Sequence, residues 1–100
     1  MVNCENERKS FLRWCDGMDG SLTKTGKGEY SFQSFSWKEG CFLTLLFGRD
    51  EDGIPCVSRK VSGRFGCPVT VSVILEEAGD CKRILEETKA MFGLREASLK

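Results

Sequence analysis

The fold of this 100-residue chain is decided by residues 28–75, which read GEYSFQSFSWKEGCFLTLLFGRDEDGIPCVSRKVSGRFGCPVTVSVIL. Within this stretch, segments rich in aromatic and β-branched residues alternate with glycine-containing turns, for example GRDEDG at 48–53. Strand-forming segments separated by such turns predict an antiparallel meander of three to four strands. We expect the strands at 29–37, 41–47, 54–61 and 69–75.

These segments differ in the burial that their residues predict. Residues 41–47, CFLTLLF, are nearly all apolar, which is typical of a central strand covered on both faces. Residues 54–61 contain Pro55, which lacks a backbone donor and indicates a strand start or an open edge. Residues 69–75 alternate valine and leucine with threonine, serine and isoleucine, and we expect a half-buried strand there.

Two amphipathic patterns flank the meander and predict helices. Apolar residues recur at helical spacing over 3–15 and over 80–92. We expect Gly17 to end the first helix as a left-handed cap, and Asp80 and Gly93 to begin and end the second.

The remaining segments are expected to be irregular. Residues 18–28 hold three glycines among serines and threonines and predict a loop, while residues 1–2 and 94–100 are expected to fray. The whole chain is then one α+β domain over 1–100. We expect a two-layer sandwich with the N-terminal and C-terminal helices packed on one sheet face.

The composition indicates a folded protein without a strong electric field. Forty per cent of the residues are hydrophobic, and 15 basic residues balance 15 acidic ones. The longest nearly apolar run has seven residues, 41–47, which is too short to cross a membrane, and the N-terminus lacks the apolar core of a signal peptide. We expect no membrane association, a cytoplasmic location and reduced cysteines.

Several chemistries lack the residues that they need. The chain has no histidine, which excludes histidine-activated nucleophiles and histidine general bases. None of the six cysteines has Cys-x-x-Cys spacing, and the glycine-rich residues 20–28 lack the hydroxyl after lysine that a phosphate loop requires. We therefore expect no metal, no cofactor and no enzymatic activity, although a thiol-dependent reaction stays open.

That thiol alternative concerns Cys81, at the expected start of the second helix. Backbone donors and the neighbouring Lys82 and Arg83 would favour its thiolate. However, Cys81 also continues the apolar stripe of Ile84, and a buried structural thiol is inert.

An aromatic strand is the candidate binding surface. Bases of single-stranded nucleic acid stack on aromatic side chains of a sheet face that is flanked by cations. Strict alternation would place its first two aromatics on one face and the last two on the other, whereas a bulge at 33–34 would unite them. The candidate residues are Tyr30, Phe32, Phe35 and Trp37, with Lys38, Arg59, Lys60 and Arg64 around them.

The leading functional hypothesis is nevertheless a protein contact. Aromatic residues in strands usually belong to the core, and the balanced charge does not attract polyanions. An uncovered sheet face, or the edge expected at 54–61, suits a protein partner or a second copy of the chain in a homodimer. Binding of single-stranded nucleic acid, RNA above all, is the first alternative.

Overall fold

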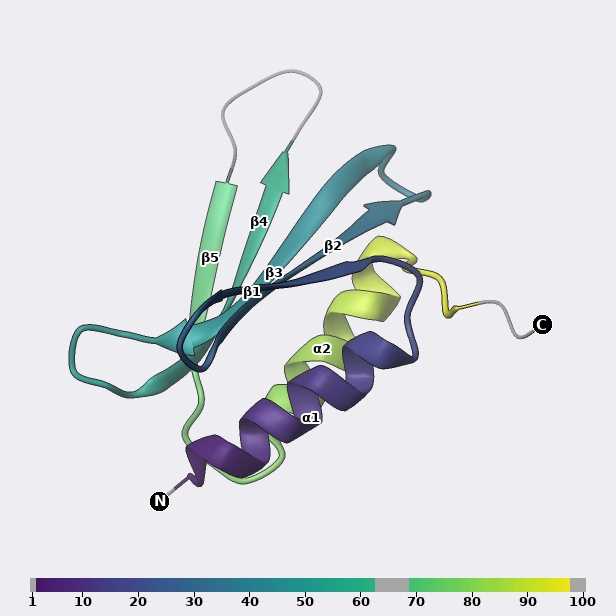
Figure 1. Cartoon of the computed structure of the whole chain (residues 1–100). Helices are drawn as coiled ribbons and strands as arrows, with labels where there is room; N and C mark the ends of the chain where they lie inside the picture. The colour runs from purple at the N-terminus through teal and green to yellow at the C-terminus, as the bar shows by residue number, and fades with distance from the viewer. Residues whose placement is uncertain (1, 63–68, 98–100) are drawn as a thin grey trace.

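The computed structural model describes residues 2–62 and 69–97 and has two layers. Two helices lie side by side on one face of a five-stranded antiparallel sheet (Figure 1). The predicted α+β sandwich is confirmed, with one strand more than expected. The elements are α1 (Cys4–Asp16), β1 (Ser21–Gly26), β2 (Glu29–Ser36), β3 (Cys41–Arg49), β4 (Pro55–Ser62), β5 (Val69–Ile74) and α2 (Asp80–Phe92).

Strand β1 was not expected, because residues 18–28 predicted a loop. It pairs with β2, with Leu22 opposite Phe32 and Lys24 opposite Tyr30, and nearly all of its side chains are exposed. A peripheral strand buries little, so its sequence carries no apolar alternation, and the pairing with β2 determines its conformation. Gly20 allows the close approach, since a Cβ there would lie 2.4 Å from the Phe32 ring.

Strand β3 lies at the centre of the sheet but is covered on one face only. Its odd-numbered residues from Cys41 to Phe47 are buried toward the helices, whereas Phe42 on the opposite face is 51% exposed. The expectation of cover on both faces was therefore wrong. The opposite face of the sheet, which we call the outer face, has no described element packed over it (Figure 1).

The strand order is β1-β2-β3-β4-β5, which moves the open edge away from residues 54–61. Strand β4 is internal, with Val57 opposite Phe47 on one side and opposite Val73 on the other. Pro55 stands at the first position of β4, where a missing donor is tolerated. The edge that sequence reasoning assigned to β4 belongs instead to β5.

The core is formed where the two helices meet the sheet. From α1, Phe11 contacts Phe47 with ring centroids 5.4 Å apart, and Trp14 meets Phe32 edge-on at 6.0 Å. The described core residues also include Ile84 and Leu85 of α2 and Leu75 after β5. Each buried aromatic or aliphatic side chain of this kind contributes about 1.5–3 kcal/mol relative to exposure.

The ends of the helices differ from expectation at two of three caps. Gly17 follows α1 with φ −87°, so it is not a left-handed cap, whereas Gly93 after α2 has φ 60° as predicted. The N-cap of α2 is Gly79 rather than Asp80. The carboxylate of Asp80 instead accepts hydrogen bonds from the backbone N–H groups of Glu76 (3.0 Å) and Glu77 (2.9 Å).

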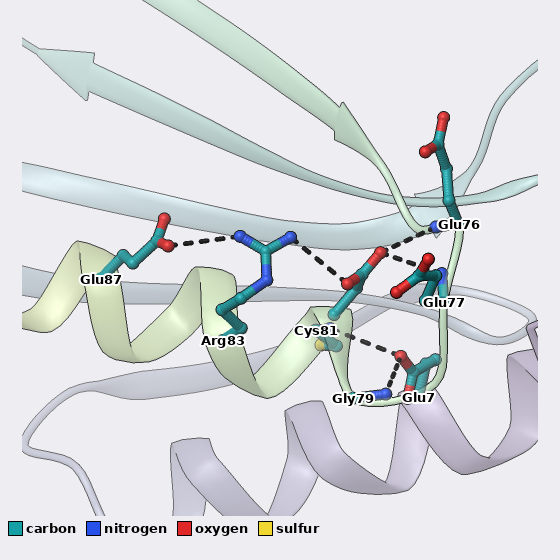
Figure 2. Close-up of polar contacts among 8 residues, drawn as sticks. Glu7, Glu76, Glu77, Gly79, Cys81, Arg83 and Glu87 are labelled. Carbon is teal, nitrogen blue, oxygen red and sulfur yellow. Dashed lines mark hydrogen bonds and ion pairs between the residues drawn. The ribbon is translucent and has the colours of Figure 1, made fainter.

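The carboxylate that caps α2 comes from the other helix. Glu7 of α1 is only 3% exposed, and its Oε1 accepts hydrogen bonds from the backbone N–H groups of Gly79 (3.0 Å) and Cys81 (3.4 Å) (Figure 2). The negative charge also faces the positive end of the helix dipole. One buried side chain thus satisfies donors that α2 cannot satisfy itself.

The segment after α2 is bound to the turn after α1 rather than frayed. Leu94 is buried, the N–H of Asp19 donates to the carbonyl of Arg95 at 3.0 Å, and the N–H of Ala97 donates to that of Gly17 at 3.0 Å. The expected fraying of 94–100 is wrong for 94–97. Residues 98–100 lie outside the described part of the chain.

Replacing Glu7 tests the importance of this cap. Glu7→Ala leaves buried N–H groups unpaired and should lower the free energy of unfolding by about 2–3 kcal/mol, because bonds to charged groups are worth about that much. Glu7→Gln keeps an acceptor and should cost about half as much. Chemical denaturation followed by circular dichroism measures both; Glu5→Ala, an exposed control on the same helix, should cost less than about 1 kcal/mol. Equal losses in all three variants would contradict the capping role.

Candidate functional site

The structure separates the four aromatic residues of the predicted binding strand. Strand β2 pairs with β3 in one continuous register, without the bulge at 33–34, so its side chains alternate strictly. Phe32 is buried beneath the helices and Tyr30 is half-buried on the same side. Only Phe35 and Trp37 remain away from the helices, and the site with all four rings together does not form.

A smaller aromatic cluster takes its place on the outer face. The Phe35 ring lies edge-on to Trp37 at 4.8 Å and edge-on to Phe42 at 5.1 Å, and the guanidinium of Arg95 lies 4.5 Å from the Trp37 ring centroid. Sequence reasoning missed Phe42 and Arg95. Alternation along β3 would have placed Phe42 outward, whereas nothing local indicated that the segment of Arg95 folds back.

The predicted cations do not surround this cluster. Lys60 lies on the outer face of β4, opposite Thr44 and two residue pairs along the ladder from Phe42. Arg59 points to the helix side, where Nη1 donates to Thr88 Oγ1 at 3.4 Å. Lys38 follows Trp37 in the exposed turn before β3, and Arg64 lies outside the described residues.

Cys81 has the environment of an inert thiol. Its side chain is 0% exposed, and burial, followed by the nearby Glu7 carboxylate and Cys15, raises its pKa to about 12. Burial also raises the pKa of Cys15 to about 12. A reactive thiolate needs the opposite conditions, so the expected activation by the helix start is outweighed and the thiol alternative loses its physical basis.

Strand β5 forms an open edge of unusual composition. Its sequence VTVSVI carries no charge and no proline, and its burial pattern is exposed at every position except a half-buried Val73. No described strand pairs with its outer side. Edge strands in soluble proteins are normally protected by charge, proline or a bulge, and a flat uncharged edge is a template for pairing.

The backbone direction of β5 follows from one hydrogen bond at its end. The N–H of Leu75 donates to the carbonyl of Pro55 at 3.0 Å, and the β4–β5 register is unbroken. Because backbone groups alternate along a strand, the odd-numbered residues bond to β4. The N–H and C=O groups of Thr70, Ser72 and Ile74 therefore point away from the sheet.

The opposite edge of the sheet is protected in the ordinary way. Strand β1 carries Lys24, and its register against β2 shifts between Lys24 and Gly26. A charge and a bulge on an edge discourage pairing with another chain. The β1 edge is thus protected against pairing with another chain, whereas the β5 edge carries no such protection.

Apolar surface continues from β5 on both of its ends. Beyond Ile74, a cavity of about 670 Å³ is lined mainly by apolar residues, among them Ile54 and Pro55. On the helix side, Val69 is 62% and Met91 of α2 is 51% exposed. Sequence reasoning could have located this edge, because the last strand of a meander has only one neighbour.

A second hollow has no comparable character. It measures about 720 Å³ and lies between the start of α1 and the β1–β2 and β3–β4 turns. Four cationic and four acidic side chains line it together, so neither sign of ligand charge is selected. Within residues 2–62 and 69–97, no cluster of three or more candidate metal ligands occurs, and no helix has the length and apolar character to span a membrane.

Comparison with known proteins returns no match. No protein-family model fits the sequence, and no curated protein and no solved structure is significantly similar to it. The strand β5 and the outer face are therefore the features of the described residues that bear on function.

The thiol assignments lead to a labelling prediction. With a pKa of about 12, only about one in ten thousand Cys15 and Cys81 side chains is a thiolate near pH 8. Among the five described cysteines, iodoacetamide should therefore modify half-buried Cys4 first and leave Cys15 and Cys81 unmodified until the protein is denatured. Peptide mass spectrometry of native and denatured samples measures this order. Modification of Cys81 as fast as that of Cys4 would reopen thiol chemistry.

Proposed function

We propose that this protein is a small non-enzymatic interaction module that binds an extended strand of a protein partner at the edge of β5. The observation that carries the proposal is the run of outward backbone groups at Thr70, Ser72 and Ile74 on a strand without charge. Strand addition uses such groups for affinity and neighbouring hollows for specificity. The absence of histidine from the chain agrees with a non-enzymatic role.

The surroundings of β5 indicate which strand would fit. A partner strand would place alternate side chains on the two sheet faces. On the helix side they would meet Val71, which is 46% exposed, and near Ile74 a large apolar side chain could enter the 670 Å³ cavity. The partner strand that fits this edge is an uncharged segment rich in β-branched residues.

The cellular setting is part of the proposal. All five described cysteines carry free thiols, which is usual in a reducing intracellular compartment. A cytoplasmic interaction module agrees with this state of the thiols.

Single-stranded RNA binding is the second candidate, and the outer-face cluster favours it. Phe35, Trp37 and Phe42 lie together near two cations, Lys60 and Arg95. Aromatic and guanidinium planes both stack on bases. We rank it below strand addition because the rings already pack against one another, Arg95 already covers Trp37, and the chain has no net charge.

A peptide titration tests strand addition. The probe is a synthetic peptide with the sequence VTVSVI between lysines, added to dilute ¹⁵N-labelled protein. We expect amide shifts and slowed hydrogen exchange at Thr70, Ser72 and Ile74, because their outward N–H groups gain acceptors. The same peptide with a central proline is the matched control and should not bind.

The variant Ser72→Pro separates binding from folding. It removes the outward backbone donor and the exposed Ser72 hydroxyl that is bonded to Ser58 Oγ, but no backbone hydrogen bond to β4, so the far-ultraviolet circular dichroism should persist while peptide binding is lost. Shifts confined to the outer-face aromatics, or no shifts at saturating peptide, would contradict strand addition at β5.

A fluorescence titration tests the RNA alternative. Trp37 is 59% exposed whereas Trp14 is buried, so stacking of a base should quench the Trp37 signal. Each phosphate contact to single-stranded nucleic acid contributes a slope of about −0.7 to log K against log salt. Lys60→Ala should therefore reduce the magnitude of this salt slope by about 0.7, whereas replacement of the exposed Lys9 on α1 by alanine should not change it. Unchanged fluorescence with excess oligonucleotide would eliminate this candidate.

A further inference from the structure

We infer that the strand received by β5 is the β5 strand of a second copy of this chain, so that two sheets join into one across a two-fold axis. This inference rests on the proposed strand addition and names its partner. Pairing of β5 with itself is antiparallel and isologous, which is the commonest form of a symmetric dimer. The two-fold axis then stands perpendicular to the sheet and leaves the helices of both copies on the same side.

The direction of the backbone groups selects one register. Residues that point outward must face outward-pointing residues of the second copy, where each pair exchanges two hydrogen bonds. With Ser72 on the axis, Ser72 faces Ser72 and Thr70 faces Ile74 of the second copy, so that all three outward residues are paired. With Val71 on the axis, Ile74 would lie opposite a position that precedes the first residue of β5 in the second copy. The two backbone hydrogen bonds of Ile74 to that copy would then be lost.

The side chains in this register are complementary. On the helix side, exposed Val71 faces half-buried Val73 of the second copy, and on the outer face exposed Ile74 faces Thr70. Within each copy, Ser58 Oγ and Ser72 Oγ are already hydrogen-bonded at 2.8 Å. The axis therefore joins two such pairs into a row of four serines, and no charge lies opposite a like charge.

The size of the contact sets the expected affinity. Six residues of edge strand with their neighbours form an interface at the small end of the range for specific complexes. We expect dimerisation at micromolar rather than nanomolar concentrations. Sedimentation equilibrium over the micromolar range should therefore show a monomer–dimer equilibrium of the full chain.

Cysteine cross-linking tests the register. Directly opposed residues of a hydrogen-bonded antiparallel pair have Cα atoms about 5.5 Å apart, which is within the span of a disulfide. Ser72→Cys should give a covalent dimer on oxidation. Thr70→Cys is the matched control, because its two copies would lie about four residues apart, or ~13 Å, along the strands. Both side chains are exposed and neither contributes to the core.

A charge variant tests the same axis without oxidation. Ser72→Lys places two ammonium groups opposite each other and should shift sedimentation to the monomer, whereas Thr23→Lys on exposed β1 should leave the dimer intact. Circular dichroism confirms that each variant is folded.

The outcomes separate this inference from the proposed function. A chain that stays monomeric at all concentrations, but binds the VTVSVI peptide at β5, overturns the homodimer and keeps strand addition. A dimer that Ser72→Lys does not weaken, or that Thr70→Cys locks as readily as Ser72→Cys, places the contact elsewhere and also overturns the inference.

Discussion

The arrangement of this protein depends on a carboxylate buried between its two helices. Glu7 lies in the first turn of α1 and accepts hydrogen bonds from backbone N–H groups at the start of α2, 72 and 74 residues later in the chain. A buried charge is tolerated only when it is paired or hydrogen-bonded, so this contact fixes how the helices lie against each other. At the other end of the layer, Ser36 Oγ donates to the carbonyl of Phe92 at 2.5 Å and ties α2 to β2.

The position of the helix layer explains why β5 is exposed. The aromatic contacts of α1 reach β2 and β3, and Thr88 of α2 meets Arg59 on β4. Beyond β4, the valines of β5 lie on the helix side with little cover, and Val69 and Val71 stay exposed. The uncharged sequence of β5 and the lack of a helix over it together favour pairing with another chain. The outer-face aromatics form a second exposed surface, but their rings already pack edge-on against one another.

Patterns within single segments predicted most of the fold, whereas long-range pairing determined what they missed. Helical spacing and turn glycines were enough for α1, α2 and four strands. They could not reveal β1, because its Ser-Leu-Thr-Lys-Thr sequence becomes a strand only beside β2. The capping role of Glu7 depends on a residue more than seventy positions away. At the candidate site, strict alternation was one of two alternatives and separated Phe35 and Trp37 from the other two aromatics; the β2–β3 register decided between them, and the edge of β5 required the strand order.

The pairing of the segment after α2 with the turn after α1 also constrains the order in which the fold can form. The N–H groups of Asp19 and Ala97 donate to the carbonyls of Arg95 and Gly17, so the turn after α1 is completed by the segment that follows α2. During synthesis, α1 leaves the ribosome before α2 and this closing segment, so it lacks both contacts until residue 97 has been made. The strands of the meander can pair earlier, because each pairs with its neighbour in the sequence. The apolar face of the sheet stays uncovered by α2 until that helix has been made. A nascent chain of this protein therefore displays an uncovered sheet, and any chaperone would meet that face before the finished fold exists.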